Sequence, residues 1–195
     1  ARDARYDNET AELLAGIERY YASLQEYPWQ KLRGGEEILT VDSEFGAHSV
    51  MYGVGICAPD TAPDTDEEWA LYAPDGVPTD CSHSGLLIQA QEVKTAFKNK
   101  SQFVPPSADE DYADLIYIYK EQGAGGSVYA CFVPLSKTNR QNGDRLRCLN
   151  TQNGVPQGYA KNGDDPCLAP ATDANVWGQN VHNSGDNAIF FCVPE

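Results

Sequence analysis

The chain of 195 residues contains no run of about 20 consecutive apolar residues, so no segment of it is expected to span a membrane. It shows no signal-peptide pattern either, and it begins with Ala-Arg-Asp-Ala-Arg, already inside a helical pattern. We therefore expect a mature or trimmed fragment of a longer protein. The length fits one domain, residues 1–195, with a core large enough to fold without a metal.

Positive charge is missing from a long part of the chain. No Lys or Arg occurs between Gly34 and Val93, while acidic residues such as those of Asp64–Glu68 gather there. The net charge is −15 and the sequence pI is about 4.4. Such a surface repels phosphate backbones and anionic lipids, so we expect no direct binding of nucleic acid or of a membrane surface. We interpret the acidic stretch as a solvated face, and a surface for cations or a basic partner is the alternative.

No two of the six cysteines form a Cys-x-x-Cys pair, which excludes a zinc ribbon and a thioredoxin-type redox site. An even number of widely spaced cysteines predicts structural disulfides formed in an oxidising compartment. Six cysteines allow 15 pairings, and the sequence does not choose among them. We prefer the sequential set, which ties neighbouring segments: Cys57–Cys81, Cys131–Cys148 and Cys167–Cys192.

Motifs for catalysis are also missing, and we expect no enzyme. The histidines His48, His83 and His182 have no ligand partner four residues on, there is no His-Glu-x-x-His, and no Gly-x-Ser-x-Gly elbow occurs. We interpret the histidines as surface or turn residues. The glycine-rich stretch Gly123–Gly126 lacks the spacing of a phosphate-binding loop and precedes a predicted strand, so it predicts a hairpin turn.

Two acidic clusters offer the oxygen ligands that Ca²⁺ prefers, Asp109–Asp111 and Asn162–Asp165. Neither follows the twelve-residue EF-hand loop, so no ion is required. Asp164 and Asp165 are the better candidates for a weak Ca²⁺ site, and we expect no other metal or cofactor.

The first segment has the clearest pattern. Mostly apolar and aromatic residues, with one threonine, recur at steps of three and four, as on one face of an α-helix: Tyr6, Thr10, Leu13, Ile17, Tyr20 and Leu24. The helix must end before Tyr27-Pro28, because proline lacks an N–H and keeps the preceding residue out of the α region. Gly16, in mid-helix, indicates either a close approach of another backbone or a tolerated weak point.

Further along, the composition predicts a second helix and several strands. We expect a helix at 85–98, capped by Ser82 or Ser84. We expect strands, rich in β-branched and aromatic residues, at 38–41, 114–120, 127–135, 145–149 and 188–193. Residues 58–65 and most of 150–185 read as loops. The predicted class is α+β: an N-terminal α-helix packed on an antiparallel β-sheet, with long disulfide-bonded loops.

The first 28 residues resemble the end of the N-terminal helix of bacterial type IV pilins and type II secretion pseudopilins. The segment Glu12-Leu-Leu-Ala-Gly-Ile-Glu-Arg-Tyr-Tyr-Ala-Ser-Leu-Gln-Glu-Tyr-Pro28 carries the resemblance: an apolar stripe, a paired aromatic, a short turn and Tyr-Pro. The preceding Arg-bearing stretch is similar to the one that follows the family's membrane segment. In family terms, residues 1–27 are the exposed half of the helix, 28–111 the variable loop region, and 112–195 the sheet and C-terminal loops.

The resemblance implies a structural subunit of an extracellular pilus or pseudopilus, serving attachment, twitching motility or secretion. A missing N-terminal segment would anchor it in the membrane before assembly, and the processing and methylation of the first residue would lie upstream. Its partners would be identical or related subunits, the inner-membrane assembly machinery and a host or surface receptor. The predicted extra helix and six cysteines, where two are typical, favour an elaborated or minor subunit.

The alternative is a free-standing secreted adhesin or binding domain. Its ligand surface would be built from the loops of residues 150–185, around Tyr159 and Trp177. Trp29, Trp69 and Trp177 are more typical of core or loop anchors than of ligand-stacking residues.

Overall fold

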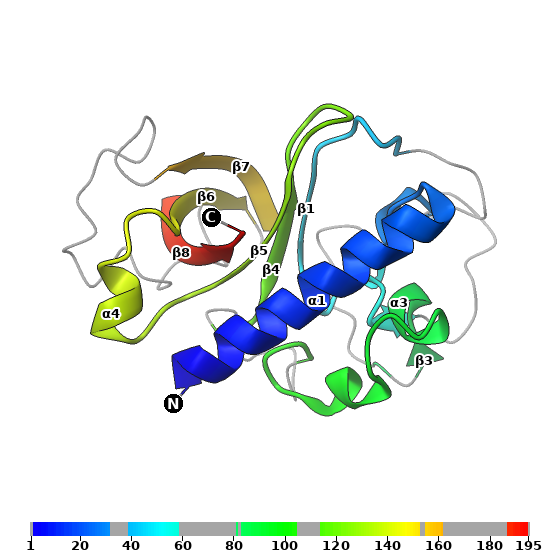
Figure 1. Cartoon of the computed structure of the whole chain (residues 1–195), viewed down its shortest axis with the longest axis horizontal. Helices are drawn as coiled ribbons and strands as arrows, with labels where there is room; N and C mark the ends of the chain where they lie inside the picture. The colour runs from blue at the N-terminus through cyan, green and yellow to red at the C-terminus, as the bar shows by residue number, and fades with distance from the viewer. Residues whose placement is uncertain are drawn as a thin grey trace.

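The computed structural model describes residues 2–31, 39–58, 81, 83–104, 114–152, 155–161 and 187–194. In these residues a long helix crosses the face of a curled six-stranded sheet, and short helices lie along one flank of the long helix (Figure 1). The predicted α+β class is confirmed, as is the antiparallel sheet.

Helix α1 spans Arg2–Leu24, and its predicted apolar stripe is buried from Tyr6 to Tyr20. The helix ends where Gln25 takes a left-handed conformation (φ 59°), and a 3-10 turn, η1, follows at Pro28–Lys31. The predicted end before Tyr27-Pro28 is therefore confirmed. The expectation that Leu24 is buried with the rest of the stripe is wrong, because its side chain is 49% exposed. The chain turns back after Leu24, and the Tyr27 ring stacks on the ring of Tyr21 instead.

The sheet has the strand order β1-β4-β5-β8-β6-β7, and every neighbouring pair is antiparallel. The strands are β1 Phe45–His48, β4 Tyr117–Lys120, β5 Val128–Phe132, β6 Leu146–Gln152, β7 Val155–Lys161 and β8 Asn187–Val193. The predicted strands 114–120, 127–135, 145–149 and 188–193 thus correspond to β4, β5, β6 and β8, with shifted ends. The late strand β8 lies in the middle, between β5 and β6.

The two outer strands of the sheet, β1 and β7, contact each other because the sheet is curled. At Gly46 in β1, a Cβ atom would lie 1.9 Å from the carbonyl oxygen of Pro156 in β7, so the position requires glycine. Each outer strand therefore covers the other, which leaves less exposed edge for pairing with another chain.

Helix α1 packs on this sheet through its contacts with β5 and β8. The Tyr6 ring lies 5.5 Å from that of Phe132 in β5, between ring centroids, and Phe132 in turn contacts Phe191 in β8. The hairpin between β4 and β5 turns at Gly123–Gly126, as predicted, with a hydrogen bond from the Gly126 N–H to the Gly123 carbonyl.

The strand predicted at 38–41 is wrong over 39–41, the part that the structure describes. Side chains compete there with strand formation: the Ser43 hydroxyl accepts the Thr40 N–H, and the Thr40 hydroxyl accepts the Asp42 N–H. The resulting turn delays the first strand until Phe45.

The single helix predicted at 85–98 is also wrong. The structure has one α-helical turn, α3 at Leu86–Gln89, and a 3-10 helix, η3 at Thr95–Asn99. Gln91 separates them because it takes a left-handed conformation (φ 61°). Gly85 starts α3 without a side-chain cap, so Ser84 does not cap it. A small two-stranded sheet precedes α3, formed by β2 Cys57–Ala58 and β3 His83–Ser84.

Candidate assembly surface

Helix α1 is held on one flank, next to the side that packs on the sheet, by the segment 92–100. The Glu9 carboxylate lies 2.5 Å from the Lys100 ammonium, and Glu12 lies 3.1 Å from Lys94. Further along, Arg19 bonds both the carboxylate of Glu92 at 2.8 Å and its carbonyl at 2.6 Å.

The three helix residues involved, Glu9, Glu12 and Arg19, lie at steps of three and seven, so they share one flank of the helix, together with Gly16 between them. Glu9 is buried and also accepts a hydrogen bond from the amide of Gln102. The segment 92–100 is therefore fixed along this flank by charge-assisted contacts at three positions of the helix, Glu9, Glu12 and Arg19.

Gly16 sits where this segment comes closest to the helix. A Cβ atom there would lie 2.6 Å from Cγ1 of Val93 and 3.2 Å from the carbonyl oxygen of Glu92. Gly16 was predicted either to allow the close approach of another backbone or to be a tolerated weak point, and the close approach is confirmed.

We expect Gly16→Leu to destabilise the protein by about 2 kcal/mol, because the new side chain must displace Val93 and the backbone at Glu92. Ala15→Leu is the matched control, since the neighbouring Ala15 is only half-buried. Chemical denaturation should show a clear loss for the first variant and little change for the second. Equal stability of both would contradict the close packing at Gly16.

The N-terminal end of α1 is clamped to the segment after β5. The buried Asp3 carboxylate accepts the backbone N–H groups of Leu135 (3.0 Å) and Ser136 (2.7 Å) and the side-chain amide of Asn139 (3.3 Å). The Ser136 hydroxyl caps the short helix α4, Lys137–Arg140. The first turn of α1 is therefore bonded to the segment that follows β5.

Arg2 and Tyr6 add to this clamp. The Arg2 guanidinium bonds the Asp114 carboxylate at 2.8 Å and the Val133 carbonyl at 3.1 Å, and it lies 4.1 Å from the centre of the Tyr6 ring. The Tyr6 hydroxyl donates to the Asp114 carbonyl at 2.9 Å. Burial raises the pKa of Tyr6, so this hydroxyl stays a donor.

The bonds of Asp3 to Leu135, Ser136 and Asn139, here called the Asp3 clamp, should stabilise the folded protein at neutral pH but not in acid. Burial alone would raise the pKa of Asp3, but the amides of Ser136 and Leu135 and the charge of Arg2 outweigh it and lower that pKa from its usual 3.8. The stabilisation is complete above pH 3.8 and disappears as the pH falls through the lowered value. The free energy of unfolding should therefore fall more steeply below pH 4 in the wild type than in Asp3→Asn.

Asp7→Asn is the control for this pH profile. Asp7 is more exposed and contacts Arg145 at 3.4 Å, and its removal leaves the Asp3 clamp intact, so this variant should keep the steep loss of stability in acid. Identical slopes for the wild type and Asp3→Asn would contradict the clamp.

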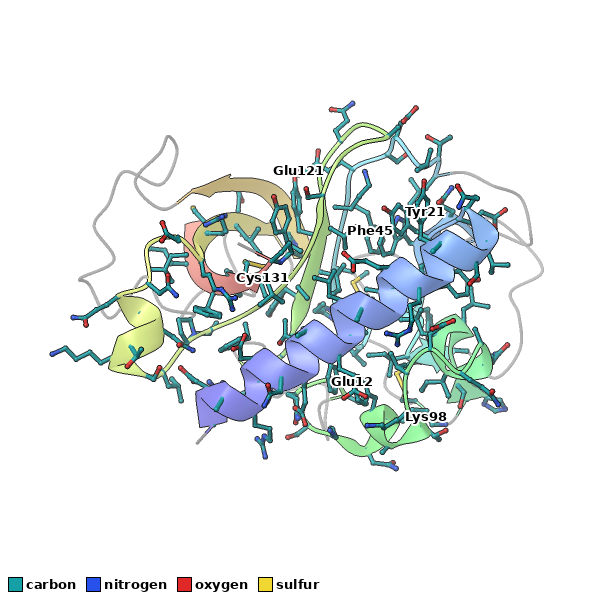
Figure 2. The ribbon with its side chains drawn as sticks, viewed as in Figure 1. Glu12, Tyr21, Phe45, Lys98, Glu121 and Cys131 are labelled. Atoms are coloured by element: carbon teal, nitrogen blue, oxygen red, sulfur yellow. A yellow bond between two sulfur atoms is a disulfide. The ribbon has the colours of Figure 1, made fainter. Side chains whose placement is uncertain are left out.

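At the other end of α1, four aromatic rings stack almost in parallel. Tyr21, Tyr27, Trp29 and Phe45 follow one another with ring centroids 4.4, 4.6 and 4.5 Å apart. Trp29 is fully buried within this stack, which confirms it as a core anchor. The stack joins the end of the helix to β1, because its first ring, Tyr21, is on α1 and its last, Phe45, is on β1; Figure 2 labels these two residues.

Lys120 lies beside this stack, fully buried at the end of β4. Its ammonium donates to the carbonyls of Glu121 (2.5 Å) and Gly123 (2.7 Å) and lies 6.0 Å from the Tyr27 ring centroid. Burial lowers the pKa of Lys120, while the nearby Asp42 and Glu121 carboxylates oppose this shift. The lysine therefore ties the hairpin tip to the aromatic stack.

Between these fixed sides, α1 leaves one face exposed along its length. The residues of this face follow heptad-like steps and are mostly small: Ala4, Asn8, Ala11, Ala15, Glu18 and Ala22. Ala15 is half-buried and the others are exposed.

The disulfides correct the predicted pairing. Cys57–Cys81 is confirmed, but Cys131 bonds Cys192, so Cys131–Cys148 and Cys167–Cys192 are wrong. Cys131 and Cys192 lie directly opposite each other on β5 and β8, whereas Cys148 is on β6, beyond β8. Cys148 is also disulfide-bonded.

Other predicted site residues fall in two groups. His48 is buried in the core, which contradicts its reading as a surface residue, while His83 is exposed in β3 as predicted. The following lie outside the described residues: Asp109–Asp111, Asp164, Asp165, Cys167, Trp69, Trp177 and His182, together with the side chain of Tyr159. In the part that the structure describes, no group of three His, Cys, Asp or Glu residues could hold a metal ion.

The chain matches no protein-family model, and neither the curated proteins nor the solved structures include a significant match to it. Among the helices of the described ranges, none has the length and apolar character needed to cross a membrane.

Proposed function

We propose that the chain is the extracellular head of a pilin-like subunit, with a structural and non-catalytic role in a type IV pilus or pseudopilus filament. The observation that carries the proposal is how the faces of α1 are packed and exposed. One face of this amphipathic helix packs on an antiparallel sheet, its first turn is clamped by Asp3, and a narrow face of small residues stays exposed. The resemblance of the first 28 residues to pilins supports the same role.

In this role the subunit is held in the membrane before assembly by a segment preceding residue 1, and it then packs beside related subunits in a helical filament on the cell surface. The assembly machinery of the inner membrane acts on that preceding segment. The clamp at Asp3 and Arg2 keeps the head and the start of the helix in one orientation, which a regular filament requires.

The test is the full-length protein in its own cell. We expect the precursor to carry a short basic leader ending in Gly and then about 20 apolar residues with a Glu near their start. Antibodies against residues 1–195 should label filaments in electron micrographs. A conventional cleavable signal peptide, with the antigen found only free in the medium, would overturn the proposal and favour a secreted binding domain.

A further inference from the structure

Two segments of the chain have the form Asn-x-Ser/Thr, the pattern of an acceptor for N-linked glycosylation: Asn8-Glu-Thr10 and Asn99-Lys-Ser101. So short a pattern often occurs by chance, and the sequence alone does not separate an acceptor from an accidental match. A glycosyltransferase must reach both the asparagine amide and the hydroxyl two positions on. The structure therefore distinguishes the two segments by what each one exposes.

The first segment lies within helix α1 and is closed in the folded protein. Asn8 is exposed, but Thr10 is fully buried in the core. Residues two positions apart in an α-helix point in directions about 200° apart around its axis, so the amide and the hydroxyl lie on different faces. The folded protein cannot present the two groups together.

The second segment begins at the end of the 3-10 helix η3 and continues into the turn that follows. Asn99 and Ser101 are both exposed. Lys100, the residue between them, has an extended backbone (φ −102°, ψ 128°), so the chain leaves the helix there. The amide of Asn99 and the hydroxyl of Ser101 are therefore both accessible at the surface, in a segment that is not held in a helix.

The contacts of this turn explain why its two polar side chains stay outside. Phe97 and Phe103, on either side, are buried and stack on each other with ring centroids 4.4 Å apart. The side chain of Lys100 reaches inward, where its ammonium lies 2.5 Å from the buried Glu9 carboxylate. Figure 2 shows the neighbouring Lys98 at the edge of the molecule. The turn is thus anchored from within and presents its asparagine and serine to the solvent.

We infer that Asn99 is the acceptor of an N-linked oligosaccharide, donated by a lipid-linked oligosaccharide phosphate. The amide nitrogen of Asn99 attacks C1 of the first sugar, and the bond between C1 and the phosphate oxygen breaks. The lipid phosphate leaves with that electron pair, and the amide gives one proton to a base of the transferase. The inference goes beyond the filament role and requires only that the chain is exported, as its disulfides indicate.

The experiment is peptide mass spectrometry of the full protein purified from its own cells. The peptide that contains Asn99 should carry the mass of an oligosaccharide, and the peptide that contains Asn8 should be unmodified. Asn99→Gln and Ser101→Ala should each lose the sugar completely. Ser101→Thr should keep it, because a threonine hydroxyl also completes the pattern.

Thr95→Ala is the matched control, since it removes another exposed hydroxyl of η3 that lies outside the pattern, and it should keep the sugar. Circular dichroism should show an unchanged fold in all four variants, because the three positions are exposed. An unmodified Asn99 in the protein from its own cells would overturn the inference. A sugar on this peptide that survives in Asn99→Gln would do the same, since it would then be linked through an oxygen. Filaments built from protein without the sugar would leave the proposed function standing.

Discussion

Replacing Ile17 by Asp should unfold the protein. Ile17 is fully buried in the middle of the stripe that α1 presents to the sheet. The change removes an apolar side chain from the core and leaves a carboxylate there without a partner, and both effects act in the same direction. Together they should cost more than about 4 kcal/mol, a large share of the total stability of a domain of this size. Circular dichroism should show no cooperative thermal transition.

Leu24→Asp is the matched control, because Leu24 continues the same helical stripe but is exposed. Its melting temperature should fall only slightly, with a cost of about 1 kcal/mol or less, mostly because a negative charge is unfavourable at a helix C-terminus. An unchanged melting temperature of Ile17→Asp would contradict the packing of α1 on the sheet.

Removing the Cys131–Cys192 disulfide should have the second large effect. This bond joins two buried residues that are 61 positions apart, so it strongly restricts the unfolded chain. In the chain-entropy estimate, a loop of this length corresponds to about 4 kcal/mol. The Cys131→Ala, Cys192→Ala double variant should therefore unfold at a much lower denaturant concentration than the wild type.

The Cys57→Ala, Cys81→Ala double variant is the comparison. It opens a loop of 24 positions, for which the same estimate gives about 3 kcal/mol, so its loss should be smaller. Peptide mapping of the unreduced protein should find the 131–192 peptide pair. A 131–148 pair would contradict the position of β8 between β5 and β6.

The helix and most strands could be predicted because their patterns are local. The stripe from Tyr6 to Tyr20 repeats over several turns, and the proline after Tyr27 sets the end of the helix. The composition of β4, β5 and β8 is rich enough in β-branched and aromatic residues to identify each as a strand. These elements depend little on what lies next to them.

The wrong predictions of secondary structure lie where a distant contact or a side-chain hydrogen bond determines the local conformation. The turn made by Thr40 and Ser43 replaced a predicted strand, and the left-handed Gln91 broke a predicted helix. Strand β7, Val155–Lys161, was predicted as loop because its Pro and Gly resemble a turn, and the contact of Pro156 with Gly46 could not be read from either segment.

Of the candidate surface, the sequence indicated the helix and the unusual Gly16 but not what they contact. Asp3, Glu9 and Lys120 appear in the sequence as ordinary charged residues, yet all three are buried. Their partners are more than 90 positions away for Asp3 and Glu9, so no local signal could identify them. In the sequence, Gly16 was the sign that another backbone could come close to the helix.

Strand β8 completes the sheet from within, because it provides the hydrogen-bonding partner of both β5 and β6. Without residues 187–193, the sheet would consist of two separate pieces, β1-β4-β5 and β6-β7, and the edges of β5 and β6 would lack their partner. The sheet can therefore be completed only after residues 187–193 have been made. Until then Cys131 lacks its partner Cys192, so the disulfide that joins β5 to β8 can form only as the last step in completing the sheet.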